Sequence, residues 1–129
     1  MTDPSATTAR EPALRNFAMP ANANANGDIF GGWLMAQMDL AGAAVAIRRA
    51  HGRVATVAVD AMTFHKPVLV GDLVSCYAEI VKVGRTSMTV KIETWVERRG
   101  GGAIEKVTEG TFIFVAIDDS GRPRPVERP

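Results

Sequence analysis

The chain has 129 residues, of which 47% are hydrophobic, and its formal net charge at pH 7 is +1. This length suits one domain with a substantial core, and the near-neutral charge argues against nucleic acid or an anionic membrane as a partner. The single cysteine, Cys76, excludes an intrachain disulfide and favours a reducing, cytoplasmic setting. The sequence contains no apolar run long enough to span a bilayer, and its beginning lacks the apolar core of a signal peptide.

The first predicted elements lead into one long helix. We expect residues 1–12 to form a flexible tail and residues 13–19 to form a strand, because Pro20 closes that apolar run. An Ala/Asn loop follows, and Asp28 is expected to cap the coming helix. The helix is predicted over residues 30–50, since Gly52 then ends it. Its surface is apolar nearly all round, a pattern typical of a buried helix.

Beyond the helix the hydrophobic pattern has a period of two residues, which indicates strands. Val57, Val59 and Ala61 are expected on one face of the first of these strands, with Met62 and Phe64 on the other. The turns are short, so the strands are predicted to form an antiparallel meander. The four predicted strands cover residues 53–65, 73–83, 88–96 and 104–117, and residues 120–129 are expected to be an irregular C-terminal tail.

Together the elements predict a single α+β domain over residues 13–119, in which a curved antiparallel sheet of five or six strands wraps around one long central helix. Such a sheet is open, so its edge must be covered or paired with another copy, and we expect a homodimer. Gly42, Ala43, Ala44 and Ala46 leave a thin helix face that a second helix could approach closely.

Asp39 is the sharpest candidate for chemistry. On a helix its neighbours on the same face include Met35, Ala36 and Ala43, all of them apolar. Burying an unpaired carboxylate is costly, so an acid at this position needs either a dedicated partner or a function. The functional alternatives are a general base and a nucleophile toward an acyl carbon, and the structural alternative is an ion pair.

The start of the same helix could bind an anion. Gly31 and Gly32 let a ligand approach the backbone N–H groups at the positive end of the helix, and the N–H of Gly32 could hold a developing oxyanion. Asn24 lies shortly before the helix. Its amide could orient a water molecule or a substrate carbonyl, or it could serve only the local turn.

Cations and hydroxyls at strand ends form a second group of candidates. Lys66, Arg85, Thr86, Ser87 and Arg98 could clamp phosphates, although exposed charges often serve only solubility. The two histidines share no metal-ligand spacing with each other or with the cysteine, so we expect no zinc site. The sequence also contains no Gly-x-Ser-x-Gly elbow, no dinucleotide fingerprint and no Walker loop.

The stretch from Asn24 to Asp39, N-A-N-G-D-I-F-G-G-W-L-M-A-Q-M-D, resembles the active-site segment of hotdog-fold acyl-CoA thioesterases, and more narrowly that of the bacterial YciA-type enzymes. The resemblance runs from about Arg15 to Arg124 and has the family's motifs in order. Its further matching segments are residues 15–20, 50–54, 62–67, 70–72 and 83–87.

The resemblance implies hydrolysis of acyl-CoA to CoA and a carboxylic acid, with no cofactor. It also implies homodimers that often assemble as a trimer of dimers, which is a hexamer. Asp39 matches the catalytic acid, Gly32 the oxyanion donor and Asn24 a motif asparagine that acts across the dimer interface. The positions that the resemblance places around the substrate and CoA are Phe30, Gly31, Lys66, Arg85, Thr86, Ser87 and Arg98.

Two other functions are compatible with the same fold. A non-catalytic module that binds acyl-CoA needs no acid on the helix, so the set of Asn24, Gly32 and Asp39 favours an enzyme. A dehydratase or hydratase would use a histidine before or within the helix, and neither His51 nor His65 lies there.

Overall fold

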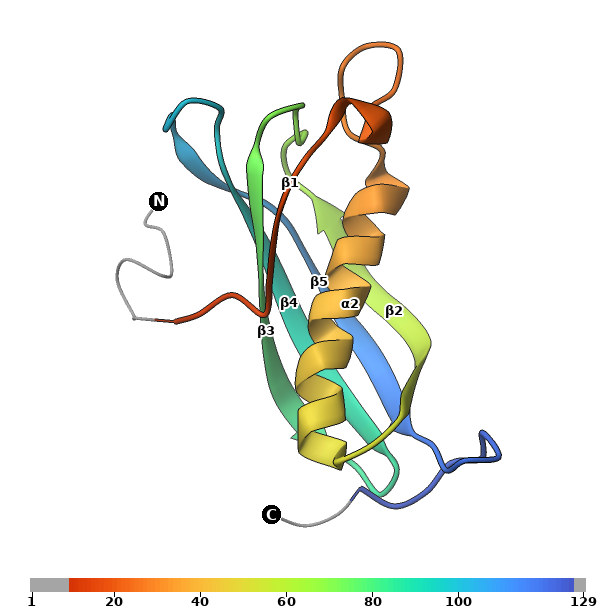
Figure 1. Ribbon diagram of the computed structural model, residues 1–129. Helices are drawn as coiled ribbons and strands as arrows, with labels where there is room; N and C mark the ends of the chain where they lie inside the picture. The colour runs from red at the N-terminus through yellow and green to blue at the C-terminus, as the bar shows by residue number, and fades with distance from the viewer. Residues whose placement is uncertain (1–9, 127–129) are drawn as a thin grey trace.

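The computed structural model describes residues 10–126, so most of the expected N-terminal tail and the last three residues of the C-terminal tail lie outside the described residues. Figure 1 shows one long helix lying across the concave side of a curved sheet. The elements in chain order are β1 (Leu14–Phe17), the short 3-10 helix η1 (Pro20–Asn22), α2 (Gly31–Ala50), β2 (Val54–Phe64), β3 (Leu73–Val83), β4 (Ser87–Glu97) and β5 (Ile104–Ala116). These bounds confirm the predicted order of elements.

The sheet has five antiparallel strands in the order β1-β3-β4-β5-β2. The fold-class prediction is therefore confirmed, and β3, β4 and β5 form the expected meander. The meander prediction was wrong for β2, which pairs with β5 and not with β3. Residues 65–72 carry the chain over the end of the sheet, and β2 becomes an edge strand.

A glycine lets α2 lie close to the sheet. A Cβ atom on Gly42 would lie 2.8 Å from Ile92 Cδ1 and from the ring of Phe114, so no larger residue fits without moving the helix. Ala46, one turn later, is fully buried. Gly42 and Ala46 therefore pack against the chain's own sheet, and their predicted role in a contact with a second helix was wrong.

The opposite face of α2 is exposed in the single chain. Leu40 and Ile47 keep 57% and 47% of their surface accessible. The prediction of a helix buried on all sides is therefore wrong for one chain, because the sheet covers one face of α2 only. Within residues 10–126 no helix is long and apolar enough to cross a membrane.

Strand β2 departs from simple alternation. Its register against β5 shifts between Thr56 and Ala58 and again between Asp60 and Thr63, and Ala61 adopts a left-handed conformation with φ of 51°. Each inserted residue moves the following side chains to the other face of the strand. The predicted separation of residue 59 from residues 62 and 64 was therefore wrong, since all three side chains lie on the side toward α2.

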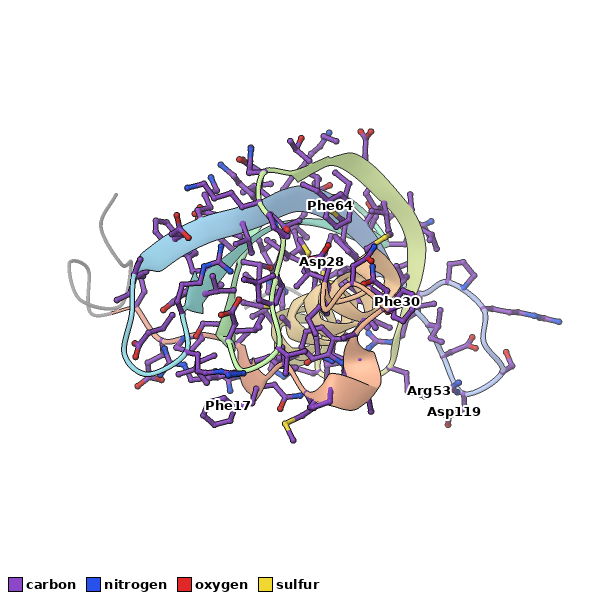
Figure 2. All side chains as sticks on the ribbon, turned by 90° about the horizontal axis from the view of Figure 1, so that it is seen from above. Phe17, Asp28, Phe30, Arg53, Phe64 and Asp119 are labelled. Carbon is purple, nitrogen blue, oxygen red and sulfur yellow. The ribbon has the colours of Figure 1, made fainter. Side chains whose placement is uncertain are left out.

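The segment after β5 folds back onto the end of α2. Arg124 Nη2 donates a hydrogen bond of 2.8 Å to the carbonyl of Ala50, and its Nε donates one of 3.2 Å to the carbonyl of Ile117. His51 follows the helix with a left-handed φ of 53°. In Figure 2 Arg53 and Asp119 lie side by side in the same region, where Arg53 Nη1 donates to the Asp119 carbonyl at 3.2 Å.

Candidate active site

A cavity of about 290 Å³ lies between α2 and β2, and we call it the Asp39 cavity. Its floor is Phe112 of β5, which is almost completely buried. Apolar groups make up most of its wall, and Asp39 is the ionisable side chain in it. The lining residues are Gly32, Met35, Ala36, Asp39, Thr56, Val59 and Phe112. The structure thus brings Asp39 and Gly32 to one hollow, as a catalytic role for both requires.

Thr56 of β2 reaches across this cavity to Asp39. Its hydroxyl donates a hydrogen bond of 2.6 Å to Asp39 Oδ1. A threonine hydroxyl has a single proton, so this bond orients the carboxylate and leaves Oδ2 for another donor. Asp39 itself is partly exposed in the single chain, not buried as expected. Sequence analysis missed Thr56, and the signal that could have found it is a polar side chain on the helix-facing side of β2.

The first turn of α2 presents unpaired N–H groups. Phe30 is the N-cap residue, and its carbonyl accepts hydrogen bonds from Trp33 and Leu34 at 3.1 and 3.3 Å. No side chain caps this helix, so the N–H groups of Gly31 and Gly32 have no partner in the described part of the chain. They lie at the positive end of the helix dipole and suit a developing oxyanion.

Asp28 does not cap α2, so that prediction was wrong. It lies two residues before the N-cap, and its backbone forms an isolated bridge with Leu69. The physical reason is the turn that precedes it, in which the Asp28 N–H donates to the side chain of Asn24 at 3.2 Å. Asp28 is therefore part of the loop and not of the helix end.

Asn24 uses its side-chain oxygen locally. Oδ1 accepts the N–H groups of Asn26 at 2.9 Å and Asp28 at 3.2 Å, which closes the turn before α2. The Asn24 amide nitrogen has no partner within residues 10–126 and remains available as a donor. Asn24 does not line the Asp39 cavity of its own chain.

A second cavity of about 290 Å³ lies at the N-terminal end of α2, and we call it the Phe64 cavity. The ring of Phe64 lies 3.6 Å from the position that a Cβ on Gly31 would take. Phe64 and Phe30 are 50% and 54% exposed, and Figure 2 shows both, with Asp28, around this end of α2. The lining residues are Ile29, Gly31, Leu34, Phe64, His65, Lys66, Pro67 and Val68.

Lys66 and Arg98 are held in ion pairs beside this cavity. Lys66 Nζ lies 2.6 Å from Glu105 Oε1, and Arg98 Nε lies 2.9 Å from Glu105 Oε2. Arg98 Nη1 also lies 2.6 Å from Oδ2 of Asp72, whose side chain is 2% exposed. A hydrogen bond from Lys66, which contributes most, and one from Arg98 hold the pKa of Glu105 below its usual value. Two of the three cations predicted to bind phosphate, Lys66 and Arg98, therefore have carboxylate partners within the chain.

Arg85, Thr86 and Ser87 lie at the opposite end of the sheet. Arg85 and Thr86 lie in the turn between β3 and β4, and Ser87 is the first residue of β4, near the C-terminal end of α2 (Figure 1). Arg98 directly follows the other end of β4, whose 11 residues span roughly 36 Å. One chain does not bring the turn and Lys66 to a common phosphate site. In the described residues, no group of three or more His, Cys, Asp or Glu side chains could hold a metal ion.

Residues 26–103 match the family model described as the thioesterase superfamily, and this match covers more than half of the chain. The chain belongs to this superfamily. The acyl-CoA thioester hydrolase YciA of Salmonella typhimurium is 54% identical over 129 residues, covering 98% of this chain and 97% of that protein.

Solved structures of other thioesterases agree with the family match. A hexameric thioesterase from Yersinia pestis is 54% identical and has a TM-score of 0.88, with 92% of this chain and 97% of that chain covered. A hexameric hotdog fold thioesterase of Campylobacter jejuni is 37% identical and has a TM-score of 0.87, and the superposition covers 93% of this chain and 92% of that chain. The hotdog fold inferred from sequence is thus confirmed.

Within this thioesterase chain the two cavities take up four of the predicted site residues. Asp39 and Gly32 share one cavity with Thr56, and Gly31 and Lys66 line the other. Phe30 is the N-cap residue of α2 and lines neither cavity. The remaining predicted positions, Asn24, Arg98 and residues 85–87, line neither cavity of the same chain.

Proposed function

We propose that the chain hydrolyses acyl-CoA thioesters to free CoA and a carboxylic acid, with Asp39 at the reacting centre. The observation that carries the proposal is the position of the Asp39 carboxylate on an apolar cavity, oriented by Thr56 at 2.6 Å. Gly32 lies on the same cavity at the start of α2, where its N–H has no helical partner. The name of the Salmonella relative supports the acyl-CoA substrate class.

The spacing along α2 favours Asp39 as a general base over a nucleophile. Asp39 follows Gly32 by seven positions, which is about 10 Å along a helix axis. A carbonyl oxygen about 3 Å from the Gly32 N–H leaves its carbon several ångströms short of the Asp39 carboxylate. A water molecule fills such a space, and a carboxylate on the far side can take its proton.

The proposed reaction then follows. Asp39 accepts a proton from the water, whose oxygen attacks the thioester carbon, and the negative charge that develops on the carbonyl oxygen faces the Gly32 N–H. Collapse of the tetrahedral intermediate breaks the carbon–sulfur bond. The CoA thiolate leaves and takes up the proton that Asp39 holds, which restores the carboxylate, and the carboxylic acid loses its own proton to water as it is released.

A second copy of the chain completes this proposed site. Strand β2 is an edge strand, with Val57 and Val59 exposed, and pairing two β2 edges in a homodimer would cover the Asp39 cavity. In an antiparallel pair of β2 strands, residues 85–87 of one chain would also lie at the same end of the joined sheets as Lys66 of the other chain. A catalytic role for the Asn24 amide requires the partner's Asn24, and the hexameric relatives support a trimer of dimers.

The test is release of CoA thiol from a series of acyl-CoAs by the full chain and by Asp39→Asn. The amide keeps the size of the side chain and an oxygen for the Thr56 hydroxyl, but it cannot take a proton. We expect turnover to fall by about 100-fold or more. Asp119→Asn, which changes an exposed aspartate in the segment after β5, is the matched control and should leave turnover unchanged.

Two results would contradict the proposal. Turnover by Asp39→Asn close to that of the parent would remove Asp39 from the reaction. Binding of acyl-CoA by the parent without any release of thiol would favour the alternative, a non-catalytic acyl-CoA-binding module.

A further inference from the structure

Met62 stands between the two cavities. The helix-facing side of β2 carries Thr56 and Val59 at the Asp39 cavity and Phe64 at the Phe64 cavity. Met62 comes between them in sequence and lines neither cavity, and its side chain packs partly buried against the hydrophobic core. It therefore occupies the part of the groove between α2 and β2 that separates the two hollows.

The space that Met62 fills is left by a glycine on the neighbouring strand. A Cβ on Gly110 of β5 would lie 2.9 Å from Met62 Cε and 3.1 Å from its Sδ, but 3.5 Å from its Cα. The end of the methionine side chain thus lies directly on the Gly110 backbone. Phe112, the floor of the Asp39 cavity, is the next residue of β5 with the same orientation.

The second register shift of β2 directs Met62 into this space. Asp60 pairs with Thr111 and Thr63 pairs with Glu109, so two residues of β2, Ala61 and Met62, lie opposite Gly110 alone. Asp60 Oδ1 accepts the N–H of Ala61 at 2.8 Å, which supports its left-handed conformation. The position of Met62 is therefore fixed by the backbone, while its unbranched side chain remains adaptable.

We propose that Met62 limits the length of the acyl chain that the Asp39 cavity accepts. This inference rests on the proposed function, because it takes the thioester to lie between Gly32 and Asp39. From that point an apolar chain that runs along the groove over Phe112 meets Met62 at the boundary with the Phe64 cavity. A shorter side chain at residue 62 would join two cavities of about 290 Å³ each.

Met62→Ala tests the inference through the ratio of kcat/KM for dodecanoyl-CoA to that for butyryl-CoA. The substitution removes the side chain beyond Cβ, which leaves room for about three further carbons of substrate. Each methylene that becomes buried favours the longer substrate about fourfold, so we expect the ratio to rise by about tenfold or more. Met19→Ala, an exposed methionine on the loop before η1, is the matched control.

Gly110→Ala tests the same inference in the opposite direction. The new methyl group meets only the flexible end of Met62 at less than 3.4 Å, so the methionine can move toward the groove without a shift of the backbone. We expect the ratio of kcat/KM for dodecanoyl-CoA to that for butyryl-CoA to fall by about fivefold or more, because the groove becomes shorter. This variant remains informative if Met62→Ala does not fold.

Three outcomes would overturn the inference. The first is a chain-length profile that stays within about twofold of the parent's in the folded variants. The second is an equal change of KM for all acyl-CoAs, which would place Met62 against the CoA arm. The third is absence of hydrolysis by the parent, which would refute the proposed function as well and is thereby distinguishable from the first two.

Discussion

The hydroxyl of Thr56 and the carboxylate of Asp39 join β2 to α2 across the candidate site, with 2.6 Å between Oγ1 and Oδ1. A carboxylate on a partly exposed helix face can occupy several rotamers, and a short hydrogen bond from a neighbouring strand selects one of them. Because Thr56 touches Asp39, we assign it a positioning role.

Replacing Thr56 with valine should lower kcat more than it changes KM. Valine keeps the branched shape and removes the hydroxyl, so Asp39 loses its orienting donor. Since a hydrogen bond to a charged group contributes about 1.5–3 kcal/mol and this one is partly exposed, we expect kcat to fall by about tenfold. Thr56→Ser keeps the donor and should recover most of the activity. Equal kcat values for the valine and serine variants would contradict the positioning role.

The Asn24 side chain allows a test that separates turn formation from catalysis. Asn24→Asp keeps an oxygen that can accept the N–H groups of Asn26 and Asp28, so the turn and the melting temperature should be preserved. It removes the amide donor that the partner's site would use. We expect kcat/KM to fall by about 100-fold.

Two other results would argue against a donor role for Asn24. Asn24→Asp with activity near that of the parent would show that the side chain serves the turn alone. A large drop in melting temperature would show that the loss of activity follows from unfolding. Asn26→Asp, two residues along the same loop, provides the control for an added negative charge there.

The parts of the site that sequence could predict lie on one element. Gly32 and Asp39 belong to a single helix, and helical periodicity alone places them on the same side. Asn24 was also correctly placed before that helix. Local patterns are sufficient for such relationships because they need no knowledge of strand order.

The parts that sequence did not predict depend on the pairing of strands. Thr56 meets Asp39 because β2 pairs with β5 at the edge of the sheet, which its hydrophobic pattern does not reveal. Met62 turns toward α2 because of a register shift that strict alternation excludes. Arg85 and Lys66 looked alike as cations at strand ends, yet they lie at opposite ends of the sheet.

The ion pairs of Glu105 predict a stability that depends on pH. Lys66 and Arg98 donate to its carboxylate at 2.6 and 2.9 Å and lower its pKa in the folded state. In the unfolded chain a glutamate has a pKa of about 4.3. Because the folded-state pKa of Glu105 is lower, its charge stabilises the fold fully at pH values above about 4.3. This stabilisation is lost as the pH falls through the folded-state pKa. Residues 65–72, which lead from Phe64 to β3, are tied to the β4–β5 hairpin by the pair of Lys66 with Glu105 and by that of Arg98 with Asp72.

Thermal unfolding of the parent and of Glu105→Gln at several pH values measures this contribution. We expect the variant to melt below the parent at neutral pH, and the difference to shrink as the pH falls below about 4.3 and through the lowered folded-state pKa of Glu105. Glu79→Gln, an exposed glutamate on β3, should show no such trend. A difference between parent and Glu105→Gln that stays constant across this range would mean that packing, and not the charge of Glu105, accounts for it.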